Sequence, residues 1–111
     1  MTARTLVIQP DGTHEYRDVP TMYPAFNQAV LDGGFMECVY GVWDDEQVVF
    51  TFDEEGGPYI KNLPRNAKAE ELLERIFGQP GMLCGPVAVN GYQADAMTDV
   101  PKGVESLFKE L

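Results

Sequence analysis

Residues 35–43 read FMECVYGVW, residues 44–46 read DDE, and residues 47–52 read QVVFTF. The first segment contains seven aromatic, sulfur-containing or β-branched side chains in nine residues, which is typical of a β-strand. In the last segment Val48, Phe50 and Phe52 alternate, so that they share one face of a strand. Two such strands joined by a short acidic turn predict a central antiparallel hairpin.

The chain before this hairpin predicts a second hairpin and a helix. Residues 4–9 and 13–19 flank Pro10-Asp11-Gly12, a tight-turn signal, and this arrangement indicates two antiparallel strands. Residues 22–31 carry apolar side chains at the i, i+3, i+4 spacing of one helical face. Asp32-Gly33-Gly34 ends that helix, because glycine readily adopts a left-handed cap conformation.

The chain after the central hairpin predicts further elements of both kinds. Tyr59-Ile60 predicts a short strand, and Asn66 predicts the N-cap of a helix over residues 67–77. Residues 82–90 predict a strand with an irregularity at Gly85-Pro86, and residues 91–97 predict a loop. A last helix is expected to begin after Thr98 or Asp99 and to continue to Leu111.

The predicted order, β-β-α-β-β-(β)-α-β-α, favours an α+β fold. We expect a mainly antiparallel sheet of about five strands, with two or three helices packed on one face of it. The 111 residues form one domain, 1–111, because a single hydrophobic core commonly serves chains of about 100–150 residues.

Charge restricts the classes of partner. Asp and Glu number 18 against 8 Lys and Arg, and the formal net charge is −10. This balance argues against direct binding to nucleic-acid phosphates or to an anionic membrane. No apolar run reaches the roughly 18 residues of a membrane-spanning helix, and no signal peptide is expected, so we predict a cytoplasmic protein.

The chemistry-bearing residues form no recognised catalytic pattern. Cys38 and Cys84 lie in apolar runs, which predicts buried free thiols. The single histidine, His14, lies in a polar strand, and the single serine, Ser106, lies on the last predicted helix. We therefore predict no catalytic, cofactor-binding or metal-ligating residue, and expect that the protein is not an enzyme.

Acidic turns are the one unusual feature of the sequence. One follows residues 35–43 and the other follows residues 47–52, so a hairpin places them at opposite ends, about 20 Å apart. They are either solvated turns that keep the protein soluble, or a surface that docks on a basic partner with Trp43 as an apolar anchor. The candidate partner-binding surface consists of Trp43, Asp44, Asp45, Glu46, Asp53, Glu54, Glu55, Glu70, Glu71 and Glu74.

Several short motifs, taken together, resemble a family. They are Leu6-Val7-Ile8-Gln9-Pro10, Gly33-Gly34-Phe35-Met36-Glu37, Leu63-Pro64-Arg65-Asn66 and Gly85-Pro86-Val87-Ala88-Val89-Asn90-Gly91. The chain resembles a domain-of-unknown-function family of small acidic proteins found mainly in bacteriophages, plasmids and other mobile elements. The resemblance implies a cytoplasmic accessory protein of a phage or mobile element, and no activity that could be assigned to a residue.

The leading functional hypothesis is a phage-type, non-enzymatic binder or inhibitor of a host protein, acting through the acidic surface. Mimicry of DNA by regularly spaced carboxylates is one form of it. The alternatives are a protein that binds a small molecule or nucleotide signal, and a carboxylate-based enzyme whose signature would be a pocket with converging Asp or Glu side chains. Pairing of exposed sheet edges into a homodimer is a further alternative.

Overall fold

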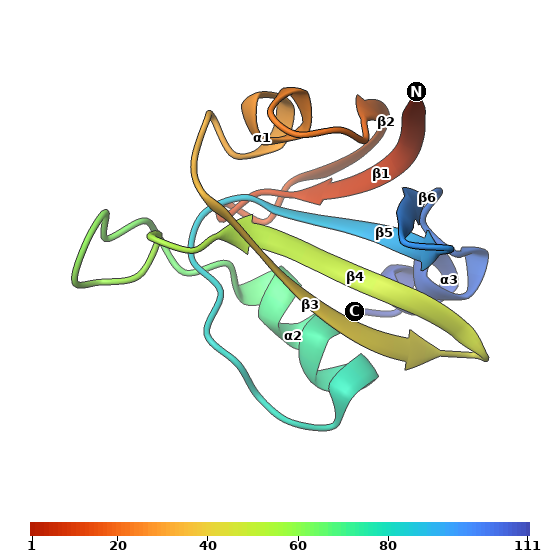
Figure 1. Ribbon diagram of the computed structural model, residues 1–111. Coiled ribbons are helices and arrows are strands. Elements are labelled where there is room, and N and C mark those ends of the chain that lie inside the picture. The colour runs from red at the N-terminus through yellow and green to blue at the C-terminus, as the bar shows by residue number, and fades with distance from the viewer.

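The protein is described by a computed structural model that covers residues 1–111, and it has the predicted α+β architecture (Figure 1). Five strands form the main sheet in the order β2-β1-β5-β4-β3, with every neighbouring pair antiparallel, and β6 pairs with β5 outside this order. The elements in chain order are β1 (Thr2–Ile8), β2 (His14–Pro20), α1 (Ala25–Val30), β3 (Met36–Trp43), β4 (Glu46–Asp53), α2 (Ala67–Phe77), β5 (Val87–Gln93), β6 (Ala96–Thr98) and α3 (Lys102–Lys109).

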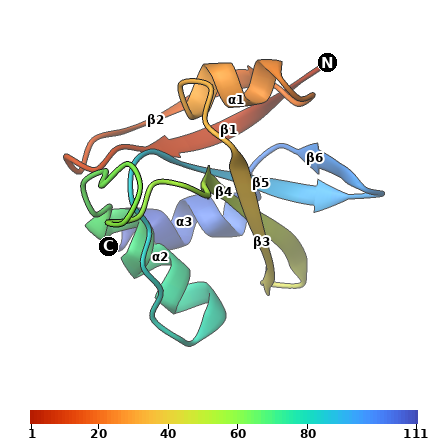
Figure 2. The ribbon, with the colours of Figure 1, turned by 60° about the vertical axis from the view of Figure 1, so that its left-hand side comes forward.

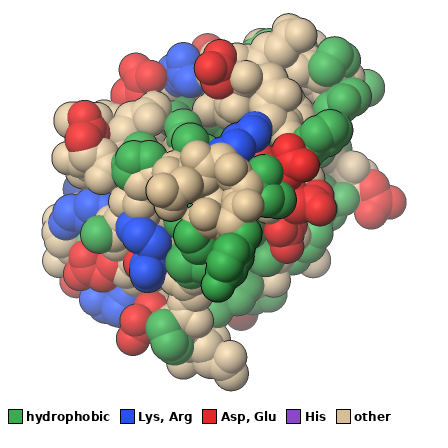
Figure 3. Space-filling view, turned by 90° about the vertical axis from the view of Figure 1, so that its left-hand side faces the viewer, with side chains coloured by type: hydrophobic (Ala, Val, Ile, Leu, Met, Phe, Trp, Pro, Cys, Tyr) green, Lys and Arg blue, Asp and Glu red, His purple; other side chains and the backbone are tan.

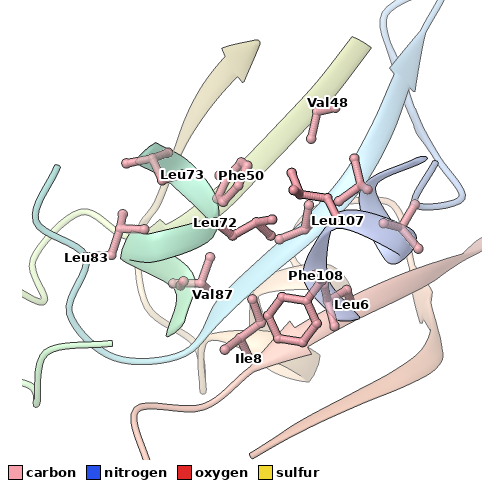
Figure 4. Packing of buried hydrophobic residues seen from close by; sticks show 14 residues of the cluster. Leu6, Ile8, Val48, Phe50, Leu72, Leu73, Leu83, Val87, Leu107 and Phe108 are labelled. Atoms are coloured by element: carbon pink, nitrogen blue, oxygen red, sulfur yellow. The ribbon is translucent and has the colours of Figure 1, made fainter. Parts of the chain in front are cut away.

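The helices cover both faces of the sheet, and the prediction of a single covered face is wrong. α2 and α3 lie on one face, where 14 buried residues form the main core, most of them from β1, β4, β5 and these helices (Figures 2 and 4). α1 lies on the other face, where Phe26, Val30 and Leu31 pack with Val7, Val19 and Ala88 in a smaller core. An apolar helical stripe indicates burial, but it does not indicate which face of the sheet will receive it.

Helix α2 begins where Asn66 predicts. The Asn66 carboxamide oxygen accepts the backbone N–H of Ala69 at 3.2 Å, which is an N-cap hydrogen bond. Its amide nitrogen donates to the carbonyl oxygens of Ile8 and Gly85, both at 2.9 Å, and the residue is completely buried. One side chain therefore joins the start of α2 to the end of β1 and to the segment before β5.

Four other predictions in the second half of the chain are wrong. Tyr59-Ile60 lies in an exposed turn rather than a strand, and the strand predicted over residues 82–90 begins only at Val87. The loop predicted over residues 91–97 contains the end of β5 and most of β6. Neither Thr98 nor Asp99 caps α3, because Thr98 pairs in β6 and Asp99 Oδ1 accepts the backbone N–H of Arg4 at 2.8 Å.

The first helix is shorter than predicted, and one thiol is less buried. α1 contains Ala25–Val30 instead of residues 22–31, and Met22 is 70% exposed. Cys84 is buried as predicted, whereas Cys38 is only partly buried, with its Sγ 3.6 Å from the Thr51 hydroxyl. Both cysteines are free.

Two tight turns use positive backbone φ angles without glycine. Asp44 and Asp45, between β3 and β4, have φ of 54° and 63°, and Ala94 and Asp95, between β5 and β6, have φ of 51° and 61°. Two successive positive φ angles are the signature of a type I′ hairpin turn, which matches the twist of the flanking strands. The β3–β4 turn thus places Asp44 and Asp45 at the tip of the central hairpin.

Candidate functional site

The two acidic turns lie at opposite ends of β4, as the sequence predicts. Asp44 and Asp45 join β3 to β4, whereas Glu54 and Glu55 follow the last residue of β4. The end of the hairpin that contains residues 53–55 belongs to the face in Figure 3, where acidic side chains gather beside a basic one and next to hydrophobic ones. The two turns therefore lie at separate ends of the hairpin.

Asp53, a member of the predicted surface, is engaged inside the chain. Its side chain is 3% exposed, and its Oδ2 accepts a hydrogen bond from Lys61 Nζ at 2.6 Å. Its Oδ1 accepts the backbone N–H of Glu55 at 2.9 Å. The hydrogen bond that Lys61 donates to Asp53 raises the pKa of Lys61. Asp53 thus fixes the loop after β4 and offers no free charge to a partner.

Glu70 is engaged in the same way at the start of α2. Arg65 donates two hydrogen bonds to its carboxylate, at 2.6 and 2.9 Å, and the backbone N–H of Leu83 donates a third at 3.0 Å. The bond from Arg65 is the main cause that lowers the pKa of Glu70 below its usual value of 4.5, with the bond from Leu83 adding to it. Glu71 and Glu74, on the same helix, are exposed.

The Glu70 contacts predict a pH-dependent contribution to stability. A lowered folded-state pKa means that ionised Glu70 stabilises the fold above the unfolded pKa, near 4.5, and that this stabilisation is lost as the pH falls through the folded pKa. We expect Glu70→Gln to cost about 1 kcal/mol at neutral pH, because charge-assisted bonds to Arg65 and Leu83 are weakened. Urea unfolding at neutral pH measures this cost, and the difference from wild type should shrink in acid. Glu71→Gln is the matched control and should have little effect; equal costs for both variants would contradict the assignment.

The carboxylates of the β3–β4 turn line a groove at the other end of the hairpin. It has a volume of about 1180 Å³ and lies between this turn, β6 and the start of α3. Asp44, Asp45 and Glu46 form one side, and Asp99 also lines it. Four carboxylates and one basic side chain, that of Lys102, therefore line the groove. Figure 1 shows this turn near α3, far from the loop after β4.

The three turn carboxylates have no ion pair within the chain. The salt bridges of the protein are Arg4–Glu105, Arg17–Glu15, Lys61–Asp53 and Arg65–Glu70. Asp44, Asp45 and Glu46 take part in none of them, and all three are exposed. These charges are therefore available to an external cation, in contrast to those of Asp53 and Glu70.

Trp43 packs between the β3–β4 turn and the main core. It is half-buried and packs against the main core, and it ends β3 in register with Glu46. Gly103, in the first turn of α3, approaches it closely: a Cβ atom there would lie 3.2 Å from Asp44 Oδ2 and 3.7 Å from the indole. The tryptophan is thus mainly a packing residue, with part of its ring at the surface beside the groove.

Sequence reasoning missed two members of the groove, Asp99 and Lys102. Both are distant from the central hairpin in sequence, and they reach the groove because β6 pairs with β5 and leads the chain back to that edge. Since β6 was predicted as a loop, no sequence signal placed them beside Asp44.

Other chemistry-bearing residues lie apart from the groove. His14 is exposed, and its ring makes an edge contact with Phe108 at a centroid distance of 4.9 Å. No three His, Cys, Asp or Glu side chains come together in an arrangement that could hold a metal ion. No helix is long and apolar enough to cross a membrane.

No protein-family model, curated protein or solved structure matches this chain. The resemblance to the phage and mobile-element family stays a prediction. The fold itself is an antiparallel α+β sheet with helices on both faces, a class that many unrelated functions share. The function must therefore be argued from the groove and its charges.

Proposed function

We propose that the protein is a non-enzymatic binding protein that captures a basic segment of a partner protein in the groove beside the β3–β4 turn. The observation that carries this proposal is the set of unpaired, exposed carboxylates of Asp44, Asp45 and Glu46 on one side of that groove. Of the ten residues in the predicted surface, Trp43 and these three are the ones that lie at the groove end of the hairpin.

Electrostatics explains why such a groove suits a basic segment. The negative electrostatic potentials of several carboxylates add along a concave surface. This combined potential attracts a cationic partner and raises its association rate. Each exposed pair with a Lys or Arg side chain contributes about 0.2–1 kcal/mol, so several pairs are needed for measurable affinity. The rigid type I′ turn limits the conformational entropy that binding would cost.

Acid–base catalysis by the same carboxylates is the less favoured function. A catalytic acid or base usually lies in an environment that shifts its pKa, such as a buried site or a close pair of carboxylates. The three turn carboxylates are exposed to solvent, and this suits electrostatic attraction of a partner better than proton transfer.

The biological setting follows only from the family resemblance. A phage or mobile-element protein that modifies a cytoplasmic host protein would use such a surface on a nucleic-acid-binding target, whose surface is basic. DNA mimicry is a narrower form of this proposal. It would require carboxylates at regular spacing along one face, whereas two of the predicted acids, Asp53 and Glu70, are engaged within the chain.

A titration with a synthetic tetra-arginine peptide tests the proposal. We expect the backbone amide NMR signals of Asp44, Asp45 and Gly103 to shift during the titration, and added salt to reverse the shifts. Signals of Glu54 and Glu55, at the other end of β4, should move little. Shifts spread evenly over all acidic residues, or concentrated at residues 54–55, would contradict a specific role for the groove.

A further inference from the structure

The second edge of the sheet, β3, has an unpaired row of backbone groups. β3 pairs only with β4. The Glu54 N–H donates to the Phe35 carbonyl oxygen at 2.7 Å, and this bond shows which residues of β3 direct their backbone groups toward β4. Because strand residues alternate in direction, residues 37, 39, 41 and 43 direct their N–H and C=O groups toward β4. The same groups of Met36, Cys38, Tyr40 and Val42 therefore point away from the sheet.

Two apolar side chains of this edge, and a third just before it, are exposed. Tyr40 is 56% exposed, Val42 is 59% exposed and the preceding Phe35 is 62% exposed. Tyr40 also makes an edge contact with the Tyr92 ring at 5.0 Å, and these two residues with Val42 line a shallow hollow of about 450 Å³. The open backbone row thus lies beside an apolar, aromatic surface.

The opposite edge of the sheet is protected by its charges. β2 contains Glu15, Arg17 and Asp18 and ends at Pro20, and charged residues and proline are common ways of blocking an edge strand. β3 contains one charged residue, Glu37, and no proline. In a chain with 18 acidic residues, β3 is therefore a strand kept nearly free of charge.

We propose that β3 pairs with β3 of a second copy of this chain, antiparallel and about a twofold axis at Val39. In this register Met36 lies opposite Val42 of the second copy and Cys38 lies opposite Tyr40, so all four outward residues are used. Such pairing forms about eight backbone hydrogen bonds, two for each of four residue pairs. It also places Glu37 opposite Gly41, which has no side chain, and no two like charges face each other.

A second copy fits this edge better than a basic peptide does. The outward row offers backbone bonds and apolar side chains, with no carboxylate among Met36, Cys38, Tyr40 and Val42 that would recognise Lys or Arg. The net charge of −10 on each copy opposes association, so salt should strengthen the dimer. Salt should instead weaken the binding of a basic segment in the groove. Because the two expected salt effects are opposite, either proposal can fail without the other.

Sedimentation velocity across a range of protein concentrations tests this inference. We expect a monomer–dimer equilibrium that shifts toward dimer when sodium chloride is raised to about 0.5 M. Val42→Lys should weaken the dimer about tenfold, because it introduces a charge at two pairs of the proposed interface. Gln28→Lys is the matched control: it adds the same charge to an exposed residue of α1, outside the proposed interface, and should weaken the dimer far less.

Amide hydrogen exchange gives a second readout that does not depend on a variant. The N–H groups of Met36, Cys38, Tyr40 and Val42 should exchange more slowly at high protein concentration, whereas those of residues 37, 39 and 41 should already be protected by β4. A monomer at every concentration in high salt would overturn the proposal. Equal effects of the two lysine substitutions, or exchange at residues 36–42 that does not depend on concentration, would overturn it as well.

Discussion

Asn66→Ala is expected to destabilise the fold by about 3–5 kcal/mol, because it removes two buried hydrogen bonds to backbone carbonyls and a helix cap. The Asn66 amide is completely buried and donates to the Ile8 and Gly85 carbonyls. Urea unfolding monitored by circular dichroism measures the loss. It is a large share of the roughly 5–15 kcal/mol by which small domains are stable.

Asn66→Ser separates the contribution of the N-cap bond from that of the two bonds to the carbonyl oxygens. Serine is as good an N-cap as asparagine, so its hydroxyl should keep the bond to Ala69 N–H, whereas the bonds to the two carbonyls are lost. We expect Asn66→Ser to be about 1 kcal/mol more stable than Asn66→Ala and still well below wild type. Wild-type stability for the serine variant would show that the two carbonyl bonds contribute little.

Phe50→Ala is expected to cost about 3–5 kcal/mol, as other truncations of buried aromatic residues do. Phe50 is 0% exposed at the centre of β4, and its ring packs edge-to-face with Phe77 of α2 at a centroid distance of 5.8 Å. The cavity would lie between the sheet and α2, where the surrounding strands prevent the core from collapsing into it. Equilibrium unfolding in urea, with the slope against urea concentration unchanged, measures this loss.

Phe52→Ala is the matched control for this prediction. Phe52 lies on the same strand and packs against the same core, but it is partly exposed. Its truncation removes the same atoms from a site that water already reaches, so we expect a smaller cost. Equal costs for the two variants would contradict the placement of Phe50 at the centre of the core.

The fold could be predicted from sequence wherever the signal was local. The central hairpin, the N-terminal hairpin at Pro10-Asp11-Gly12 and the cap at Asn66 each depend on residues a few positions apart, and all are confirmed. β6 was missed because its turn, Ala94-Asp95, lacks the Asn-Gly or Asp-Gly pattern that usually marks a type I′ turn. The position of α1 was missed because the choice of sheet face depends on the whole topology.

The candidate site could be predicted only in part for the same reason. Asp44, Asp45 and Glu46 are consecutive, so their exposure at a hairpin turn could be inferred from the sequence alone. The burial of Asp53 depends on Lys61, which reaches it from the loop after β4, and the bonds of Glu70 depend on Arg65 and on Leu83 beyond α2. A run of Asp and Glu residues does not show which carboxylates are free and which are hydrogen-bonded or ion-paired within the chain.

We expect the groove carboxylates, rather than the net charge of the protein, to bind a basic partner. Asp44→Asn combined with Asp45→Gly removes two groove charges and creates Asn-Gly, the sequence most favourable for the type I′ turn, so the hairpin should remain intact. Glu54→Gln combined with Glu55→Gln removes two charges at the other end of β4. Each pair of substitutions changes the net charge equally, from −10 to −10 + 2 = −8.

The most direct measurement is the affinity of these two double variants for the tetra-arginine peptide at physiological ionic strength. The screening length there is about 8 Å, so charges about 20 Å from the groove should contribute little. We expect the Asp44–Asp45 variant to bind about fivefold more weakly than wild type and the Glu54–Glu55 variant to bind almost as wild type does. Equal losses in the two variants, or an unchanged affinity in the first, would contradict the proposed function.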